Sequence, residues 1–581
     1  MRPGALARPR IVTLPAFRLD ESPAPATPIA HPAPVAAARW RLLGALLAIA
    51  STLLFAWWVL GILGAIGLDR PLRGSSNAFF RLFAITEPSG ILVLGVFTVA
   101  VLVAMRGLPE GDDRWPALLP ARPAQGMTLA LVALAVLVVC WAGATLVMHR
   151  FALAMDEYNA SFQAAIIAQG RMSTRVPDAW SGWVVPMIPI FTTVREGAWL
   201  STYLPGYATV RAGFLALGAE WLTNPALAAL SVVLLALIAR RLWPDDARRQ
   251  WLSVAFLAAS TQFLVMSMTA YAMPAHLAVN LLWLWLYLRD DRASLVALPL
   301  LGVAALGLHN PFPHALFIAP FLLRMLRRKR FTALAYIGVV YLAGAAFWLV
   351  RMRAVGTGTG SAGVLSLFQV PGTIMLYVQG MSLALTFTWQ TPVAALCVLI
   401  GLFSWRELDD DLRDIALGIC LTFAFYFFFA SHQGHGWGYR YLYGVLGNIA
   451  LVAAAGVPVL ARAVGTKAAT RLVATSLLVS VAVQLPLRGV QAERFVRPFA
   501  SASAWLASQP ADAVLVPIHA VWYGQDLIRN DPNFAPGPRI MVAGPFTPAL
   551  LGELRKVAPR VQVVTPEDLA AQGMELVEAP K

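Results

Sequence analysis

The sequence predicts an all-α polytopic membrane protein of about thirteen transmembrane helices that ends in a small α/β domain. Of its 581 residues, 59% are hydrophobic, whereas soluble domains contain roughly 45–50%. Apolar runs of about 20 residues, long enough to cross a hydrocarbon core as helix, recur from residue 42 to residue 488. Because these runs are continuous and Leu/Ala-rich instead of alternating, they indicate helices and not the strands of a barrel.

The chain divides into three parts along its length. Residues 1–40 are rich in Pro, Ala and Arg and predict a disordered cytoplasmic tail ahead of an uncleaved first helix. Residues 41–488 form the transmembrane domain, with a large outer loop at 149–207, and residues 489–581 form the small α/β domain. The candidate spans are 42–66, 90–105, 127–148, 225–242, 251–271, 275–288, 293–308, 314–326, 331–350, 384–404, 412–430, 441–461 and 470–487.

The distribution of basic residues indicates the membrane topology. The formal charge of +15 is spread over short loops and not gathered on one stripe, which argues against a nucleic-acid partner. Loops rich in Lys and Arg, such as 324–330, alternate with loops that have none, such as 271–274 and 309–314. By the positive-inside rule the N-terminus is cytoplasmic and the C-terminal domain periplasmic, in a bacterial inner membrane.

Two segments outside the clear spans need separate interpretation. PGTIMLYVQGMSLALTFTWQT, after a Gly/Thr/Ser-rich loop, is either an interfacial helix or a span of its own, and charge alternation favours the interfacial helix. Beyond Arg488, the runs ADAVLVPIH, PRIMVAG and RVQVVTP predict strands, and FTPALLGELRKVA between them predicts a helix.

Ionisable and polar side chains gather on the predicted outer face. Asp156 and Glu157 lie side by side in the large loop, where two neighbouring carboxylates are costly unless something uses them. The other members of this group are His309, His314, Arg351, Arg353, His432, His435 and Arg440. Each one alone fits an interfacial anchor, but their convergence on one face predicts a site.

Such a set suits transfer of a group from a lipid-linked phosphate donor. A carboxylate can remove a proton from an incoming hydroxyl, while Arg and His can hold the phosphate and neutralise its growing charge. The polyprenyl chain would stay in the lipid bilayer and its sugar phosphate in the headgroup layer.

Several motifs resemble those of a known enzyme family. Asp156-Glu157-Tyr158, followed by STYLPGYATVRAGFLAL and a span ending IARRLW, resembles the GT-C glycosyltransferases of the protein O-mannosyltransferase and aminoarabinose-transferase type. HNPFPHALFIAPFLLRMLRRKR and GYRYLYGVLGNIALVAA are similar to later elements of those enzymes. The resemblance implies catalysis by Asp156 and Glu157, substrate binding by Tyr158 and Tyr203, and phosphate binding by Arg440. Two spans before residue 106 have no counterpart in it.

Other interpretations stay open at this point. The two carboxylates are also suited to cap a helix N-terminus, or to bind Mg²⁺ or Mn²⁺ through phosphate oxygens. His432 and His435 have the spacing of metal ligands on a helix, but the glycines around them argue against a helix there, and no metal ligand is assigned. The alternative functions are a lipid-linked sugar flippase or other transporter, and a non-catalytic scaffold whose outer domain recruits a partner. Deletion of residues 490–581 would distinguish the scaffold from the enzyme, because an enzyme core could survive that loss whereas a scaffold would lose its recruiting domain.

Overall fold

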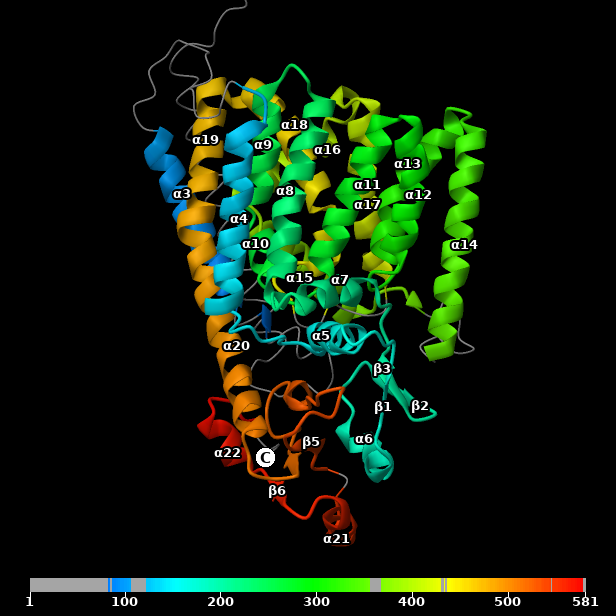
Figure 1. The fold of residues 1–581 in the computed structure, drawn as a ribbon. Coiled ribbons are helices and arrows are strands. Elements are labelled where there is room, and N and C mark those ends of the chain that lie inside the picture. Colours follow the sequence, from blue (N-terminus) through cyan, green and yellow to red (C-terminus); the bar gives the residue numbers. More distant parts are fainter. Residues whose placement is uncertain are drawn as a thin grey trace, which may run out of the picture. The chain divides into compact units, whose positions relative to one another are not determined.

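The computed structural model describes residues 82–83, 86–105, 122–355, 367–429, 433, 436–544 and 546–577. These residues belong to one compact unit, Ser51–Lys581 (Figure 1). The predicted tail, the first predicted span at 42–66, and both His432 and His435 lie outside the described residues.

Helices form most of the described chain. Those of the transmembrane bundle are α3 (Pro88–Met105), α4 (Gly126–Leu146), α8 (Thr223–Leu242), α9 (Ala247–Ala258), α10 (Thr261–Ser267), α11 (Met273–Arg289), α12 (Arg292–Leu306), α13 (Phe312–Arg327), α14 (Phe331–Val355), α15 (Thr373–Thr388), α16 (Pro392–Phe403), α17 (Asp410–Phe428), α18 (Leu446–Val464), α19 (Thr466–Val479) and α20 (Leu485–Ala507). Within the described ranges, five helical segments are long and apolar enough to cross a membrane, or up to seven if each of two bent pairs is one span. The polytopic helical fold is confirmed, and the count of thirteen stays a prediction.

Two predicted spans are interrupted. The span expected at 251–271 is divided into α9 and α10, which meet at 52°, and the Ser260 hydroxyl accepts a hydrogen bond from the Phe263 amide at the start of α10. The span expected at 384–404 is divided between α15 and α16, which meet at 112°. Pro392 occupies the first position of α16, where proline is well tolerated.

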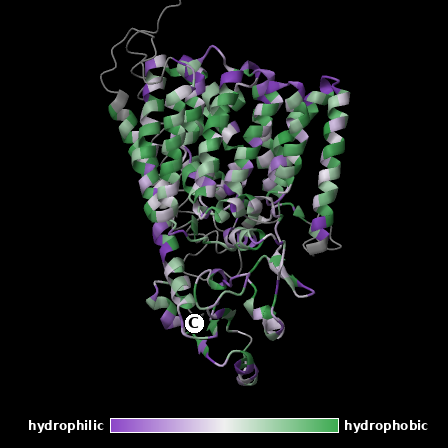
Figure 2. Ribbon diagram, in the orientation of Figure 1, coloured by the Kyte–Doolittle hydropathy of each residue, from purple (hydrophilic) through white to green (hydrophobic). Residues whose placement is uncertain are grey.

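One end of the bundle carries the basic residues. Helices α8, α11 and α13 each have arginine in the last turn, where a cation is favoured by the helix dipole. Figure 2 shows hydrophilic residues along this end and hydrophobic residues between it and the end near α5 (Met155–Ile167). This pattern agrees with the predicted inner face, and the orientation in a membrane remains a prediction.

The loop at 149–207 holds a small sheet that the all-α prediction missed. After α5 come β1 (Thr174–Arg175), the 3₁₀ helix η1 (Asp178–Trp183), α6 (Val184–Met187), β2 (Thr192–Arg195) and β3 (Ala198–Ser201), and then α7 (Gly206–Ala216). The strands are antiparallel in the order β1-β3-β2. The turn between β2 and β3 consists of Glu196 and Gly197, both with positive φ, as two-residue hairpin turns require.

The C-terminal residues form a second sheet. Strands β4 (Ala513–Val516), β5 (Arg539–Val542) and β6 (Val561–Val563) are parallel in the order β5-β4-β6, with α21 (Pro548–Val557) and α22 (Pro566–Ala571) beside them. Each of the three runs expected as strand contains one of these strands. The predicted boundary at 488–489 falls inside α20, so the bundle continues into this part through an unbroken helix.

The loop and the C-terminal sheet share one hydrophobic core. Phe162 of α5 and Trp199 of β3 pack in the same cluster as Leu515, Met541 and Leu554. We call the two segments together, residues 149–207 and 508–577, the composite domain. Deleting residues 490–581 would uncover the apolar face of the loop, so we do not expect the remaining residues to keep their packing after that deletion.

Candidate active site

The site is built on the first turn of α5, where the two acidic residues lie. Successive residues of an α-helix are about 100° apart, so neighbouring side chains face different surroundings. Asp156 faces the end of the bundle, and Glu157 faces the turn between α10 and α11. The helix N-terminus also favours negative charge at both positions.

Asp156 is held by two partners from distant parts of the chain. Its Oδ2 accepts a hydrogen bond from Arg440 Nη1 at 2.6 Å, and its Oδ1 accepts a short one from the Tyr203 hydroxyl. The Tyr203 ring in turn lies 4.1 Å, between centroids, from the ring of His309. The structure therefore brings together four residues that the sequence assigned to the site.

Arg440 is fixed by the turn that precedes α18. The Gln433 side chain donates to the Gly438 carbonyl and accepts from the Arg440 amide. Gln262 donates to the Tyr439 carbonyl at 2.7 Å, and its side chain lies so close to Gly438 that a Cβ there would stand 2.8 Å from it. Glycine at 438, with φ of +75°, thus serves both the backbone turn and the packing.

The electrostatics keep Asp156 ionised. Burial raises the pKa of Asp156, but the Arg440 guanidinium and the hydrogen bonds from Tyr203 and Arg440 outweigh it, and the net pKa lies below its ordinary value. Burial, together with the neighbouring carboxylate, raises the pKa of the Tyr203 hydroxyl, which stays protonated. Burial lowers the pKa of His309 to about 4, so its ring is neutral at physiological pH.

Glu157 is a buried residue with backbone partners. Its Oε2 accepts from the Ala270 amide at 2.8 Å and its Oε1 from the Ala154 amide at 3.4 Å. The interpretation of these carboxylates as helix caps therefore holds for Glu157 and not for Asp156. Burial raises the pKa of Glu157 to about 7.

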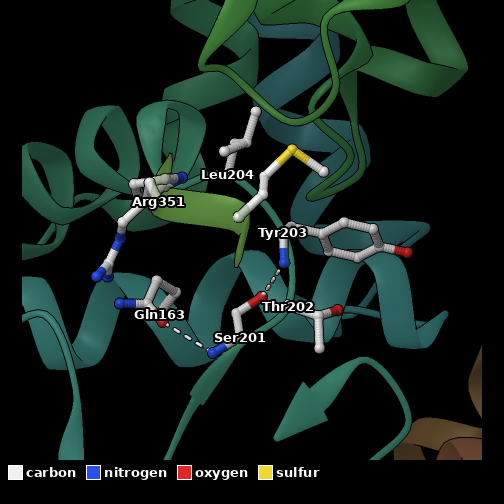
Figure 3. A pocket seen from close by; sticks show the side chains of 8 residues that line it. Gln163, Ser201, Thr202, Tyr203, Leu204 and Arg351 are labelled. Atoms are coloured by element: carbon white, nitrogen blue, oxygen red, sulfur yellow. Dashed lines mark hydrogen bonds between the residues drawn. The ribbon is translucent and has the colours of Figure 1, made fainter. Parts of the chain in front are cut away.

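Two adjoining cavities lie beside Asp156. The first is lined by Asp156, Asn159, Ala160, Gln163, Ser201, Tyr203, Leu204, Tyr207, Ala208, Ala272, Leu308 and His309. The second shares Gln163, Ser201, Tyr203 and Leu204 with the first and adds Thr202, Pro205, Arg351 and Met352. In the view of Figure 3, the Arg351 and Gln163 side chains lie on one side of this cavity and the Tyr203 ring on the other.

The remaining predicted residues lie elsewhere. The His314 ring is buried inside the bundle, 2.8 Å from both Asn280 Oδ1 and the Tyr341 hydroxyl. The Arg353 side chain is exposed, and its carbonyl accepts from Arg195. The Tyr158 hydroxyl donates to the Asn530 carbonyl at 2.5 Å, in the C-terminal part of the composite domain. None of these three residues, nor Glu157, lines either cavity.

Sequence reasoning missed the neutral side chains of the cavity. Asn159 and Gln163 follow Asp156 at intervals of three and seven residues, which places all three on one face of α5. That polar stripe is visible in the sequence and would have identified the cavity-lining face. Gln262, which supports the turn of Arg440, lies in a predicted span and gives no such signal.

The two adjacent carboxylates do not converge as a shared metal chelate. Asp156 is bound by a guanidinium and a hydroxyl, and Glu157 by backbone amides. Among the residues that the structure describes, no group of three or more His, Cys, Asp or Glu side chains is placed to hold a metal ion.

Comparison with known proteins gives the fold. No family model and no curated protein sequence matches the chain. Among solved structures, the chain shares the fold of ArnT from Cupriavidus metallidurans bound to undecaprenyl phosphate, at a TM-score of 0.50 and 14% identity over 76% of this chain and 90% of that one. This shared fold agrees with the resemblance in the motifs. ArnT from the same organism in the apo state matches with a TM-score of 0.47 and 16% identity, over 69% of this chain and 84% of that one.

Proposed function

We propose that this protein is a membrane glycosyltransferase that moves a sugar from a polyprenyl-phosphate-linked donor to an acceptor at the periplasmic face. One observation carries the proposal: an ionised carboxylate, Asp156, lines a cavity that adjoins a second cavity lined by a cationic side chain, Arg351. That pairing supplies an acceptor for a proton or hydrogen bond on one side and a phosphate ligand on the other.

Asp156 is the residue we assign to the acceptor. Glycosyl transfer passes through a state with oxocarbenium character, in which the attacking hydroxyl becomes acidic as its bond to the sugar forms. A carboxylate of low basicity, held ionised by Arg440, can therefore take that proton late in the step. The Tyr203 hydroxyl donates to Asp156. When the acceptor binds, the carboxylate would accept hydrogen bonds from both Tyr203 and the incoming hydroxyl.

Arg351 is the residue we assign to the donor phosphate. Among the described residues it forms no ion pair, whereas Arg440 is already engaged by Asp156. A guanidinium can bind two phosphate oxygens at once and offset the charge that grows on the leaving group. ArnT, a protein of similar fold, was solved with undecaprenyl phosphate bound, which supports a polyprenyl phosphate here. Arg351 lies near the end of α14, which suits a lipid tail remaining in the bilayer.

Glu157 and Tyr158 have a different place in this proposal. Their side chains contact backbone and the C-terminal residues instead of a cavity, so we assign them to holding α5 and not to the reaction. The catalytic assignment made for both carboxylates thus narrows to Asp156.

The test compares cell-envelope glycolipids and glycans by mass spectrometry with and without the protein. We expect one sugar mass to be missing without it, and expect wild type but not Asp156→Asn to restore that mass at equal membrane expression. Full restoration by Asp156→Asn would remove Asp156 from the mechanism.

A transporter of lipid-linked sugars remains the second candidate because α15 and α16 form a broken helix pair, as transporter sites often do. The buried pair of Glu87 and Arg488 lies against this break. Arg488 follows Thr466 by 22 residues of nearly continuous helix, or roughly 33 Å, which places the pair at the end of the bundle and not at its middle. Protein-dependent flipping of a lipid-linked sugar in vesicles, without transfer, would favour the transporter.

A further inference from the structure

Arg529, in the C-terminal part of the composite domain, contacts the segment that leads into α5. Its Nη2 donates to the Leu153 carbonyl at 2.6 Å, and its Nε donates to the Asp526 carbonyl at 2.6 Å. The guanidinium carbon lies 4.0 Å from the centre of the Phe151 ring and 5.2 Å from that of Tyr158. One side chain thus holds residues on both sides of Asp156.

Asn530, the next residue, binds three segments at once. Its backbone amide and carbonyl both hydrogen-bond the Tyr158 hydroxyl. Its side-chain nitrogen donates to the carbonyls of Met187 and Ile540, and its side-chain oxygen accepts from the Ile540 amide. Because Asn530 is buried and these groups are paired, its position relative to α5 is closely defined.

These contacts reach α5 at the point where Asp156 is oriented. Leu153 precedes the N-cap residue Ala154, and Tyr158 lies in the first turn with Asp156. A guanidinium surrounded by carbonyls and ring faces is expensive to bury. A surface lysine or an apolar residue would be the less costly choice if this contact only filled space.

We propose that Arg529 and Asn530 are positioning residues that hold the first turn of α5, and with it Asp156, in register with the cavity. This inference rests on the proposed transferase function. It gives the C-terminal α/β part a role that the sequence left unassigned. It also implies that the reaction depends on residues 508–577, the C-terminal part of the composite domain, which contribute no side chain to either cavity.

The test uses Arg529→Gln in the full-length protein, with Arg539→Gln as matched control. Arg539 is an arginine of the C-terminal part that is more buried than Arg529. Like Arg529, it donates to carbonyls, those of Ala535 and Gly537, and lies near an aromatic ring, 5.3 Å from that of Phe534. These three contacts all lie within the C-terminal part, so the substitution reproduces the local cost of losing a buried arginine without affecting a contact to α5.

Two measurements are made on each variant: kcat and KM for transfer, and hydrogen–deuterium exchange of the peptides covering residues 148–160. For Arg529→Gln we expect kcat to fall about ten- to a hundredfold, since a shift of about 1 Å can cost that much. We expect KM within about twofold and faster exchange in residues 148–160. Arg539→Gln should leave both measurements near wild type, and Arg529→Lys should recover part of kcat.

Tyr158→Phe gives a second variant if Arg529→Gln does not fold. It removes only the hydroxyl that Asn530 binds, and should lower kcat and raise exchange in the same direction but less. Unchanged kcat and exchange in the folded variants, or equal losses in Arg539→Gln, would overturn the inference. If wild type shows no transfer at all, the proposed function fails, while the exchange measurement still decides whether Arg529 holds α5.

Discussion

Two arginine–carboxylate pairs at the same end of the bundle differ in how completely their carboxylate is surrounded. Glu87, immediately before α3, is paired with Arg488 of α20 at 3.1 Å, and both side chains are fully buried. Asp156 is paired with Arg440 at 2.6 Å, and its side chain is 14% exposed.

The hydrogen bonds make the difference chemical. A carboxylate offers about four acceptor positions. Glu87 accepts from the Trp389 indole and the Thr388 hydroxyl in addition to Arg488, and the guanidinium lies 4.3 Å from the Trp389 ring centre. Among the residues that the structure describes, Asp156 accepts hydrogen bonds only from Tyr203 and Arg440, and it lines a cavity. The first pair has the contacts of a structural element, whereas the second has capacity left for a ligand.

Asp156→Asn is expected to have the largest effect on activity. It removes the charge that faces the cavity but keeps the shape, so transfer should fall by about 10²- to 10⁴-fold, the usual range for loss of a general base. Single-turnover transfer from a lipid-linked sugar donor measures it. If only KM changes, Asp156 contributes binding and not a reaction step.

Glu87→Gln makes the same chemical change at the enclosed pair and should act on stability. Leaving Arg488 buried without its counter-charge is expected to cost about 3–5 kcal/mol. Thermal unfolding in detergent should show this loss, while kcat per folded molecule stays near wild type. The comparison of the two pairs fails if Glu87→Gln lowers kcat as much as Asp156→Asn does.

Tyr203→Phe should have an intermediate effect. The ring remains beside His309, but Asp156 loses the donor that holds its second oxygen. We expect about a tenfold fall in kcat, in proportion to one hydrogen bond to a charged group. Steady-state kinetics at fixed pH measure this change, and an unaltered kcat would show that Arg440 alone orients Asp156.

Glu157 predicts a smaller, pH-dependent effect. The pKa of Glu157 is about 7 in the fold against an ordinary 4.5, so the folded protein binds the proton more tightly than the unfolded chain. The stability from this group is therefore complete below about pH 4.5 and is lost as the pH rises to about 7. Glu157→Gln cannot ionise, and its melting temperature relative to wild type should rise between pH 5 and pH 8. A constant difference would contradict the raised pKa.

The sequence predicted what membrane topology enforces. Asp156 and Arg440 are 284 residues apart, yet both were placed at one boundary because alternation of basic loops assigns each loop to a side. Membrane topology does not determine which face of a helix outside the membrane, such as α5, points toward the bundle. Glu157 and Tyr158 were assigned to the reaction because adjacency to Asp156 was followed, and not the stripe of Asp156, Asn159 and Gln163 that marks the cavity-lining face of α5.

The misplaced residues have local causes. The span predicted at 314–326 begins as α13 at Phe312, so His314 lies inside the helix and turns toward Asn280 instead of standing at the membrane boundary. Arg529 shows no pattern in sequence, because its partners are the carbonyl of Leu153 and two rings. Contacts of this kind depend on tertiary packing alone.

The shared core of the composite domain joins segments that are synthesised at different times. Tyr158 and Asn530, which meet in the finished protein, are 372 residues apart, a delay of roughly 20 to 75 seconds at ordinary rates of synthesis. During that interval the bundle is already entering the membrane while α5 lacks its partner surface. The first turn of α5 therefore lacks its contacts with Arg529 and Asn530 until that late part of the chain has been synthesised.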